Sequence, residues 1–279
     1  MVLLGRLEVA LIFRQLIDPE TSTYTYLLAD RKSREAVLID TVCEQFERDR
    51  TLLRELDLTL RYTLETHVHA DHVTASGRFR KELGSEVVVG AACGVANADI
   101  ELREDDRICF GGHVLVACPT PGHTCGCMTY VCAEESMAFT GDALLIRGCG
   151  RSDFQDGNAA TLFESVRKKI FSLPDETLLY PGHDYKGRTV TTVGEEKRFN
   201  PRLGLAKSEA DFVALMNQLD LAYPKKIDTA VPANLESGLA SSADLGPAMQ
   251  TRPAVTSSVA SVMETQGRQD TEMWMGMGI

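Results

Sequence analysis

Histidine and carboxylate side chains are concentrated in residues 65–75, whose sequence is Glu-Thr-His-Val-His-Ala-Asp-His-Val-Thr-Ala. His67, His69, Asp71 and His72 all fall within six residues of one another. Imidazole and carboxylate groups are metal ligands, and the packing of a protein core does not require them at this density. We therefore interpret this stretch as one half of a metal site.

The elements predicted on either side place this motif in a loop. Residues 58–64 have the pattern of a strand, and Ala75, Phe79 and Leu83 share one face of a helix that ends near Gly84. A loop between a strand and a helix holds side chains on a rigid frame and leaves them open to solvent. That position suits a catalytic metal, which needs an open coordination position, better than a closed structural one.

Three more candidate ligands follow predicted strands later in the chain. They are His123 in Thr-Pro-Gly-His-Thr, Asp142 in Phe-Thr-Gly-Asp-Ala and His183 in Pro-Gly-His-Asp. Polar side chains at the ends of several strands can converge on one point of a fold. The sixth histidine, His113, lies on an alternating strand, so we expect it to be an ordinary half-buried or surface residue.

These seven residues permit two metal arrangements. In the first, two ions are bound as in a two-metal hydrolase: His67, His69 and His123 hold one, Asp71, His72 and His183 hold the other, and Asp142 bridges them. In the second, His67, His123 and Asp142 form one face of a single iron(II) and leave three positions open. Residue type and spacing allow both.

The remaining pattern predicts a mixed α/β (α+β) domain in which each half runs from sheet to helix. Strands are expected at residues 7–17, 24–29, 36–40, 86–89, 107–110, 113–117, 128–132, 137–140 and 178–180. Further helices are expected at residues 41–57, 159–173, 192–199 and 209–219. We assign residues 1–239 to one catalytic domain. Residues 240–279 are rich in Ser, Ala, Thr, Gly and Met, and we expect a flexible C-terminal tail there.

Composition narrows the partners and the compartment. The chain has 29 Lys and Arg against 40 Asp and Glu, a formal net charge of −11, and no basic run, so nucleic acid is not an expected partner. No apolar run reaches the roughly 18 residues of a membrane span, and Arg6 and Glu8 interrupt the apolar N-terminus. The eight scattered cysteines are typical of reduced thiols rather than of a disulfide framework. A cytoplasmic enzyme that does not bind membranes is expected; for a eukaryotic chain, the mitochondrial matrix is the alternative.

The motif His-x-His-x-Asp-His at 67–72, followed in order by His123, Asp142 and His183, resembles the signature of the metallo-β-lactamase superfamily. The resemblance covers residues 7–239 and implies an αββα four-layer sandwich. Within the superfamily, three longer motifs are similar to those of the persulfide dioxygenases: Thr-Gly-Asp-Ala-Leu-Leu-Ile-Arg-Gly-Cys-Gly-Arg-Ser-Asp-Phe-Gln at 140–155, His-Asp-Tyr at 183–185 and Asn-Pro-Arg-Leu at 200–203.

This resemblance implies the single-metal arrangement, with one Fe(2+) per chain on His67, His123 and Asp142. The reaction it implies converts glutathione persulfide, O2 and water to sulfite and glutathione in sulfide oxidation. The other site residues would orient ligands and relay protons beside the iron: His69, Asp71, His72 and His183. Contacts to the glutathione carboxylates would come from Arg151, Tyr185 and Arg202. The family also suggests a homodimer.

Two other functions remain open. A glyoxalase II-type hydrolase would cleave the thioester of a hydroxyacylglutathione with a dinuclear metal site on the same scaffold. The Leu-Leu-Ile-Arg run after Asp142 and the Asn-Pro-Arg motif at 200–202 favour the dioxygenase. A metal-retaining binding protein of sulfur metabolism is the non-enzymatic alternative, which the complete ligand set disfavours. Cys149, between two glycines, is interpreted as a packing residue of a tight turn rather than a redox-sensitive thiol.

Overall fold

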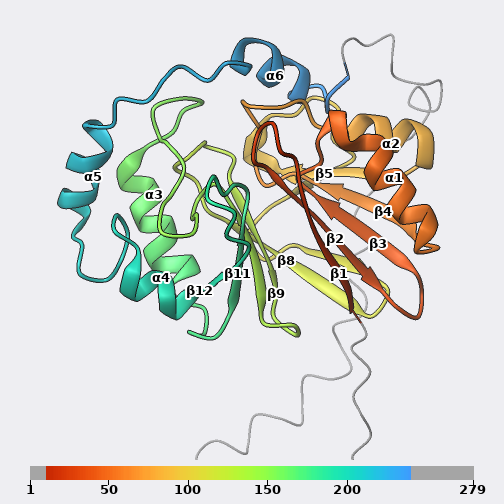
Figure 1. Ribbon diagram of the computed structural model, residues 1–279, viewed down its shortest axis with the longest axis horizontal. Helices are drawn as coiled ribbons and strands as arrows, with labels where there is room; N and C mark the ends of the chain where they lie inside the picture. The colour runs from red at the N-terminus through yellow and green to blue at the C-terminus, as the bar shows by residue number, and fades with distance from the viewer. Residues whose placement is uncertain (1–10, 240–279) are drawn as a thin grey trace, which may run out of the picture. The chain divides into compact units, whose positions relative to one another are not determined.

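Two six-stranded β-sheets form the centre of the computed structural model, which describes residues 11–239 (Figure 1). The first sheet contains, in spatial order, β1 (Leu11–Ile17), β2 (Tyr24–Asp30), β3 (Glu35–Ile39), β4 (Thr59–Leu64), β5 (Glu86–Gly90) and β6 (Ile100–Leu102). Strands β1 to β3 are antiparallel, whereas β3 to β6 are parallel. Helices α1 (Phe46–Glu55) and α2 (Ser76–Leu83) make the crossovers on either side of β4, as parallel pairing requires.

The second sheet is built from the later half of the chain. Its spatial order is β12 (Thr191–Thr192), β11 (Leu178–Pro181), β10 (Met137–Gly141), β9 (Met128–Cys132), β8 (His113–Pro119) and β7 (Arg107–Phe110). The pair β10 and β11 is parallel, and α3 (Ala159–Ser165) lies in the crossover connection that this pairing requires. The other pairs are antiparallel.

Helices cover the outer face of each sheet, and apolar residues fill three interfaces. Strand β2 is buried along its whole length: Tyr26 and Leu28 face the cluster between the sheets, while Leu27 faces the cluster under α1 and α2. A third cluster joins the second sheet to α3 and to α5 (Glu209–Asn217), for example through Leu179 and Phe212. In Figure 1, α1 and α2 lie beside the first sheet and α3 and α4 (Val193–Phe199) beside the second. The expected αββα sandwich is confirmed.

Most expected elements are confirmed, and the misses have physical reasons. Strands β6 and β12 have three and two residues, too few for a hydrophobic period to appear. Helix α6 (Ile227–Asn234) contains Pro232, which is unusual inside a helix, and was not predicted. The helix expected at 41–57 begins with a 3-10 turn at Cys43–Gln45, and the one expected at 159–173 becomes a π-helix at Val166–Ile170.

Residues 11–239 all lie in one compact unit. The expected domain boundary after residue 239 and the expected tail at 240–279 stay predictions, because 240–279 lie outside the described residues, as do residues 1–10, where the first strand was expected to begin. Across 11–239, no helix combines the length and the apolar character that crossing a membrane requires.

Candidate metal centre

The candidate ligands converge because the strands that precede them end at the same edge of the two sheets. His67 to His72 follow β4, His123 follows β8, Asp142 follows β10 and His183 follows β11. Backbone hydrogen bonds join the sheets at this edge: Met128 N donates to Thr66 O at 2.7 Å, and Tyr24 N donates to Gly182 O at 2.8 Å. The site is therefore held by strand ends from both halves of the chain.

The first donor group consists of His67, His123 and Asp142, whose ligand atoms all lie within 4.8 Å of one another. His123 Nε2 lies 3.8 Å from Asp142 Oδ2, and the ring centroids of His67 and His123 are 4.8 Å apart. Two imidazoles and one carboxylate at this spacing can share one metal ion on one face of its coordination sphere.

Hydrogen bonds orient both imidazoles toward the same point. His123 Nδ1 donates to the carbonyl oxygen of Arg151 at 2.5 Å, which leaves its Nε2 lone pair directed at Asp142. The Thr66 hydroxyl donates to Asp40 at 2.9 Å and can accept from His67 Nδ1 at 3.0 Å, which leaves His67 Nε2 free. Burial, with the neighbouring His69 and His123, lowers the pKa of His67 well below its ordinary value. Neutral, oriented imidazoles fit a divalent metal ion.

The carboxylate of Asp142 is shared between the metal donor group and His183. His183 Nδ1 lies 2.7 Å from Asp142 Oδ1, and His183 Nε2 lies 3.1 Å from Asp71 Oδ2. Burial alone would lower the pKa of His183, but the carboxylates of Asp142 and Asp71 outweigh it and raise the pKa well above its ordinary value. His183 therefore holds Asp142 in place and leaves Asp142 Oδ2 available to a metal.

A second donor group, His69, Asp71 and His72, also has its ligand atoms within 4.8 Å of one another. His72 Nδ1 lies 3.0 Å from Asp71 Oδ2, while the buried His72 Nε2 and His69 Nδ1 have no hydrogen-bond partner among residues 11–239. The structure thus brings together all seven residues of the sequence prediction. This second group contains His69 where the two-metal arrangement predicted His183, and it leaves a dinuclear arrangement open.

Two carboxylates that the sequence analysis did not single out support His69. Its Nε2 lies 3.1 Å from Asp40 Oδ1 and 3.2 Å from Glu65 Oε2. Burial alone would lower the pKa of His69, but these carboxylates raise it to about 10. Asp40 directly follows β3, so the strand-end position that identified the other ligands could have identified it as well.

The three predicted substrate contacts differ in the bonds that their side chains already make within the protein. Arg151 forms a bidentate ion pair with Asp153, both distances being 2.7 Å, and donates to Ala222 O at 2.8 Å. Tyr185 is 73% exposed, and its ring stacks on His183 with centroids 5.9 Å apart. Arg202 Nη1 lies 3.4 Å from the carbonyl oxygen of Cys149. Tyr185 and Arg202 are therefore freer than Arg151 to bind a substrate carboxylate.

The position of Arg202 depends on Asn200. Asn200 Oδ1 accepts from the backbone N of Arg202 at 3.0 Å and of Leu203 at 2.9 Å, and its Nδ2 donates to Gly148 O at 3.0 Å and to the buried Glu196 at 2.8 Å. Asn200 thus joins the motif at 200–203 to the loop after Asp142.

Cys149 and His113 lie in buried surroundings. Cys149 is 5% exposed, burial raises the pKa of its thiol to about 11, and its Sγ lies 3.9 Å from Met216 Sδ. These features favour the packing interpretation.

His113 is 5% exposed, so the expectation of a half-buried or surface residue was wrong. Its ring stacks on Phe110, with centroids 5.5 Å apart, and belongs to neither donor group at the strand ends.

Comparisons with known proteins show which family the chain resembles. A family model described as the metallo-beta-lactamase superfamily matches residues 18–183. The chain is 53% identical over 230 residues to the Homo sapiens protein named persulfide dioxygenase ETHE1, mitochondrial, an alignment that covers 82% of this chain and 89% of that protein. The crystal structure of ETHE1 from Myxococcus xanthus is 52% identical, with a TM-score of 0.79 over 82% of this chain and 100% of that one.

A hydrolase relative is more distant. A Bartonella henselae protein named hydroxyacylglutathione hydrolase is 35% identical over 176 residues, which covers 62% of this chain and 63% of that protein. The fold, the donor groups and the long alignments at more than 50% identity all agree. The chain therefore belongs to the metallo-β-lactamase superfamily and, within it, to the persulfide dioxygenases.

Proposed function

We propose that the protein is an iron(II)-dependent dioxygenase that oxidises glutathione persulfide with O2 and water to sulfite and glutathione. The observation that supports this most directly is the convergence of His67, His123 and Asp142 in a chain 53% identical to a protein named persulfide dioxygenase. A two-histidine, one-carboxylate face with open positions is typical of non-haem iron(II) oxygenases. When bound, iron(II) would supply the electron transfer that O2 requires and leave room for the persulfide.

The residues beside the donor group would orient the ligands and manage protons. The reaction forms sulfite, glutathione and two protons from glutathione persulfide, O2 and water, so the site needs groups that can accept protons. His183 lies between Asp142 and Asp71, and Thr23 Oγ1 lies 3.0 Å from His183 Nε2 and 3.1 Å from Asp71 Oδ2. We assign His69, Asp71, His72 and His183 to this supporting role.

The glyoxalase II-type hydrolase remains the second candidate because of one observation. His69, Asp71 and His72 form a donor group of their own, which a second metal could use. The relative named hydroxyacylglutathione hydrolase aligns over a shorter part of the chain at 35% identity, which disfavours this alternative.

A cytoplasmic location and a homodimer stay proposals. The word mitochondrial in the name of the human relative supports the mitochondrial matrix as the alternative compartment.

Metal analysis combined with an oxygen electrode tests the proposed function. We expect about one iron per chain, because one two-histidine, one-carboxylate face holds one ion. Oxygen uptake should depend on glutathione persulfide and should yield sulfite. Two zinc ions per chain together with rapid hydrolysis of an acylglutathione would show that the protein is a hydrolase instead.

Replacing Arg202 with alanine should weaken substrate binding rather than the chemical step. A hydrogen bond to a charged group contributes about 1.5–3 kcal/mol, so KM for glutathione persulfide should rise roughly 10- to 100-fold. The kcat should stay close to that of the unaltered protein, because Arg202 belongs to neither donor group. Arg198→Ala removes an exposed arginine from the same part of the chain and is the matched control. Equal KM values for the two variants would remove Arg202 from the substrate site.

A further inference from the structure

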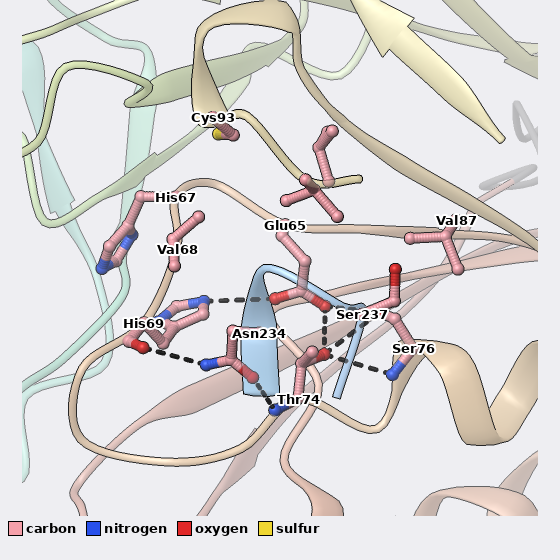
Figure 2. A pocket seen from close by; sticks show the side chains of 12 residues that line it. Glu65, His67, Val68, His69, Thr74, Ser76, Val87, Cys93, Asn234 and Ser237 are labelled. Atoms are coloured by element: carbon pink, nitrogen blue, oxygen red, sulfur yellow. Dashed lines mark hydrogen bonds and ion pairs between the residues drawn. The ribbon is translucent and has the colours of Figure 1, made fainter. Parts of the chain in front are cut away.

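Asn234, the last residue of α6, contacts the ligand-bearing loop at residues 67–74, although 160 residues separate it from Thr74. Its Nδ2 donates to the carbonyl oxygens of His69 at 2.9 Å and of His72 at 2.8 Å, and its Oδ1 accepts from Thr74 N at 2.8 Å. Figure 2 shows the Asn234 side chain between His69 and Thr74. Asn234 is 4% exposed, so water does not replace these bonds.

The chemistry of these three bonds requires a primary amide. Thr74 N can only donate, so the atom that faces it must be the amide oxygen, and the amide NH2 must face the two carbonyl oxygens. The loop at 67–74 forms neither helix nor strand, so the buried carbonyls of His69 and His72 have no partner in regular secondary structure. A buried backbone group without a hydrogen-bond partner destabilises the fold, and Asn234 provides partners for three such groups.

The residues after Asn234 are fitted closely against the same region. Ser237 O accepts from Gly77 N in α2 at 2.8 Å, and Leu235 O accepts from Ala96 N at 2.9 Å. Gly238 has a φ of +78°, and a Cβ at this position would overlap the carbonyl oxygen of Thr74. Only glycine adopts this conformation readily and also allows so close an approach. The segment 234–239 is thus bonded to α2, which follows the loop directly, and to Ala96, which follows β5.

We propose that Asn234 is a positioning residue of the metal centre. By fixing the backbone at His69, His72 and Thr74, it holds the loop in the conformation that presents His67 to the metal and His69 to Asp40 and Glu65. Without the three hydrogen bonds of Asn234, the loop would be less constrained. His67 would then no longer be held in the orientation that binds the metal. This inference rests on the metal centre proposed above.

Three variants separate this role from simple docking of α6. Asn234→Ala removes all three bonds. Asn234→Asp keeps the size and the acceptor for Thr74 N but replaces both donors with an oxygen that repels the two carbonyls. Asn97→Ala is the matched control: Asn97 Nδ2 donates to Glu236 O at 3.1 Å, and its Oδ1 accepts from Ser237 Oγ, so it holds the same segment without contacting the loop at 67–74.

The measurement is the rate at which a chromophoric chelator removes iron from the full-length protein, together with the visible spectrum of the cobalt(II)-substituted form. Loss of a residue that hydrogen-bonds to a metal ligand typically costs 10–100-fold in metal affinity. Asn234 acts one step further out, through the backbone of His69, His72 and Thr74, so both Asn234 variants should release iron about tenfold faster, at the lower end of that range. Their cobalt spectra should change, because the ligand geometry changes. Asn97→Ala should match the unaltered protein in both measurements.

The results that would overturn the proposal are equally specific. Iron release and a cobalt spectrum unchanged in Asn234→Asp would show that the amide donors are not needed. Equal changes in Asn97→Ala would show that only docking of the segment matters. If a variant does not fold, Asn234→Ser replaces it. Its single hydroxyl can donate only one hydrogen bond in place of the two amide donors, so faster iron release is again expected and an unchanged rate would count against the proposal. An unaltered protein that takes up no iron would contradict the proposed function, whereas the cobalt spectra would still judge the role of Asn234.

Discussion

Replacing Asp142 with asparagine is expected to abolish both iron retention and persulfide-dependent oxygen uptake. Asp142 is the only anionic member of the donor group with His67 and His123, so the variant leaves two neutral imidazoles and a neutral amide around the cation. Loss of a residue that merely supports a ligand lowers metal affinity or activity by about 10–100-fold. Loss of the ligand charge itself should therefore lower the affinity for iron and the rate of oxygen uptake each by about 100-fold or more.

Iron content after gel filtration and oxygen uptake at saturating glutathione persulfide are the two measurements. Asp156→Asn is the matched control, because it removes the same charge from an exposed position where φ is +55° and asparagine is tolerated. The control should keep its iron and its rate. Normal iron content and normal turnover in Asp142→Asn would refute the assignment of Asp142 as a ligand.

Replacing Phe139 with alanine is expected to lower the free energy of unfolding by about 3–5 kcal/mol, the usual cost of truncating a buried phenylalanine. Phe139 has 0% exposure and lies on β10 between the sheets. Its ring centroid is 5.0 Å from that of Tyr26, in the first sheet, and 5.4 Å from that of Tyr180, in the second. A cavity here would loosen the packing of one sheet on the other.

Chemical denaturation of the metal-free proteins measures this effect without a contribution from metal binding. Phe199→Ala is the control, since Phe199 is 55% exposed, and its loss should change the free energy of unfolding by about 1 kcal/mol or less. If Phe139→Ala unfolded at the same denaturant concentration as the unaltered protein, the contact between the sheets would contribute little to stability.

The two predictions are linked, because the position of the metal ligands depends on the packing between the sheets. Asp142 is the first residue after β10, and Phe139 lies three positions earlier on the same strand. The core between the sheets therefore fixes the strand ends, and the strand ends fix the ligands. A ligand set drawn from β4, β8, β10 and β11 can converge only when both sheets are packed together.

Local features of the sequence were enough to predict much of this protein. Elements with a clear apolar period, such as β7 and α2, are found where they were expected, because burial of one face dictates the period. The ligand candidates were found by residue type and by their position after a strand. Arg202 and Tyr185 are predicted substrate contacts only through resemblance, since arginine and tyrosine at a turn have many ordinary roles.

Only the tertiary structure decided which groups meet. The partners of His69, the pairing of Arg151 with Asp153 and the three bonds of Asn234 depend on sheet register and helix docking, which no local pattern encodes. Asn234 had no signal in the sequence because it lies in a short helix with an internal proline, far along the chain from the loop it binds. Residue types thus determined the chemistry that is available, whereas burial, which forces every polar group to find a partner, decided how it is arranged.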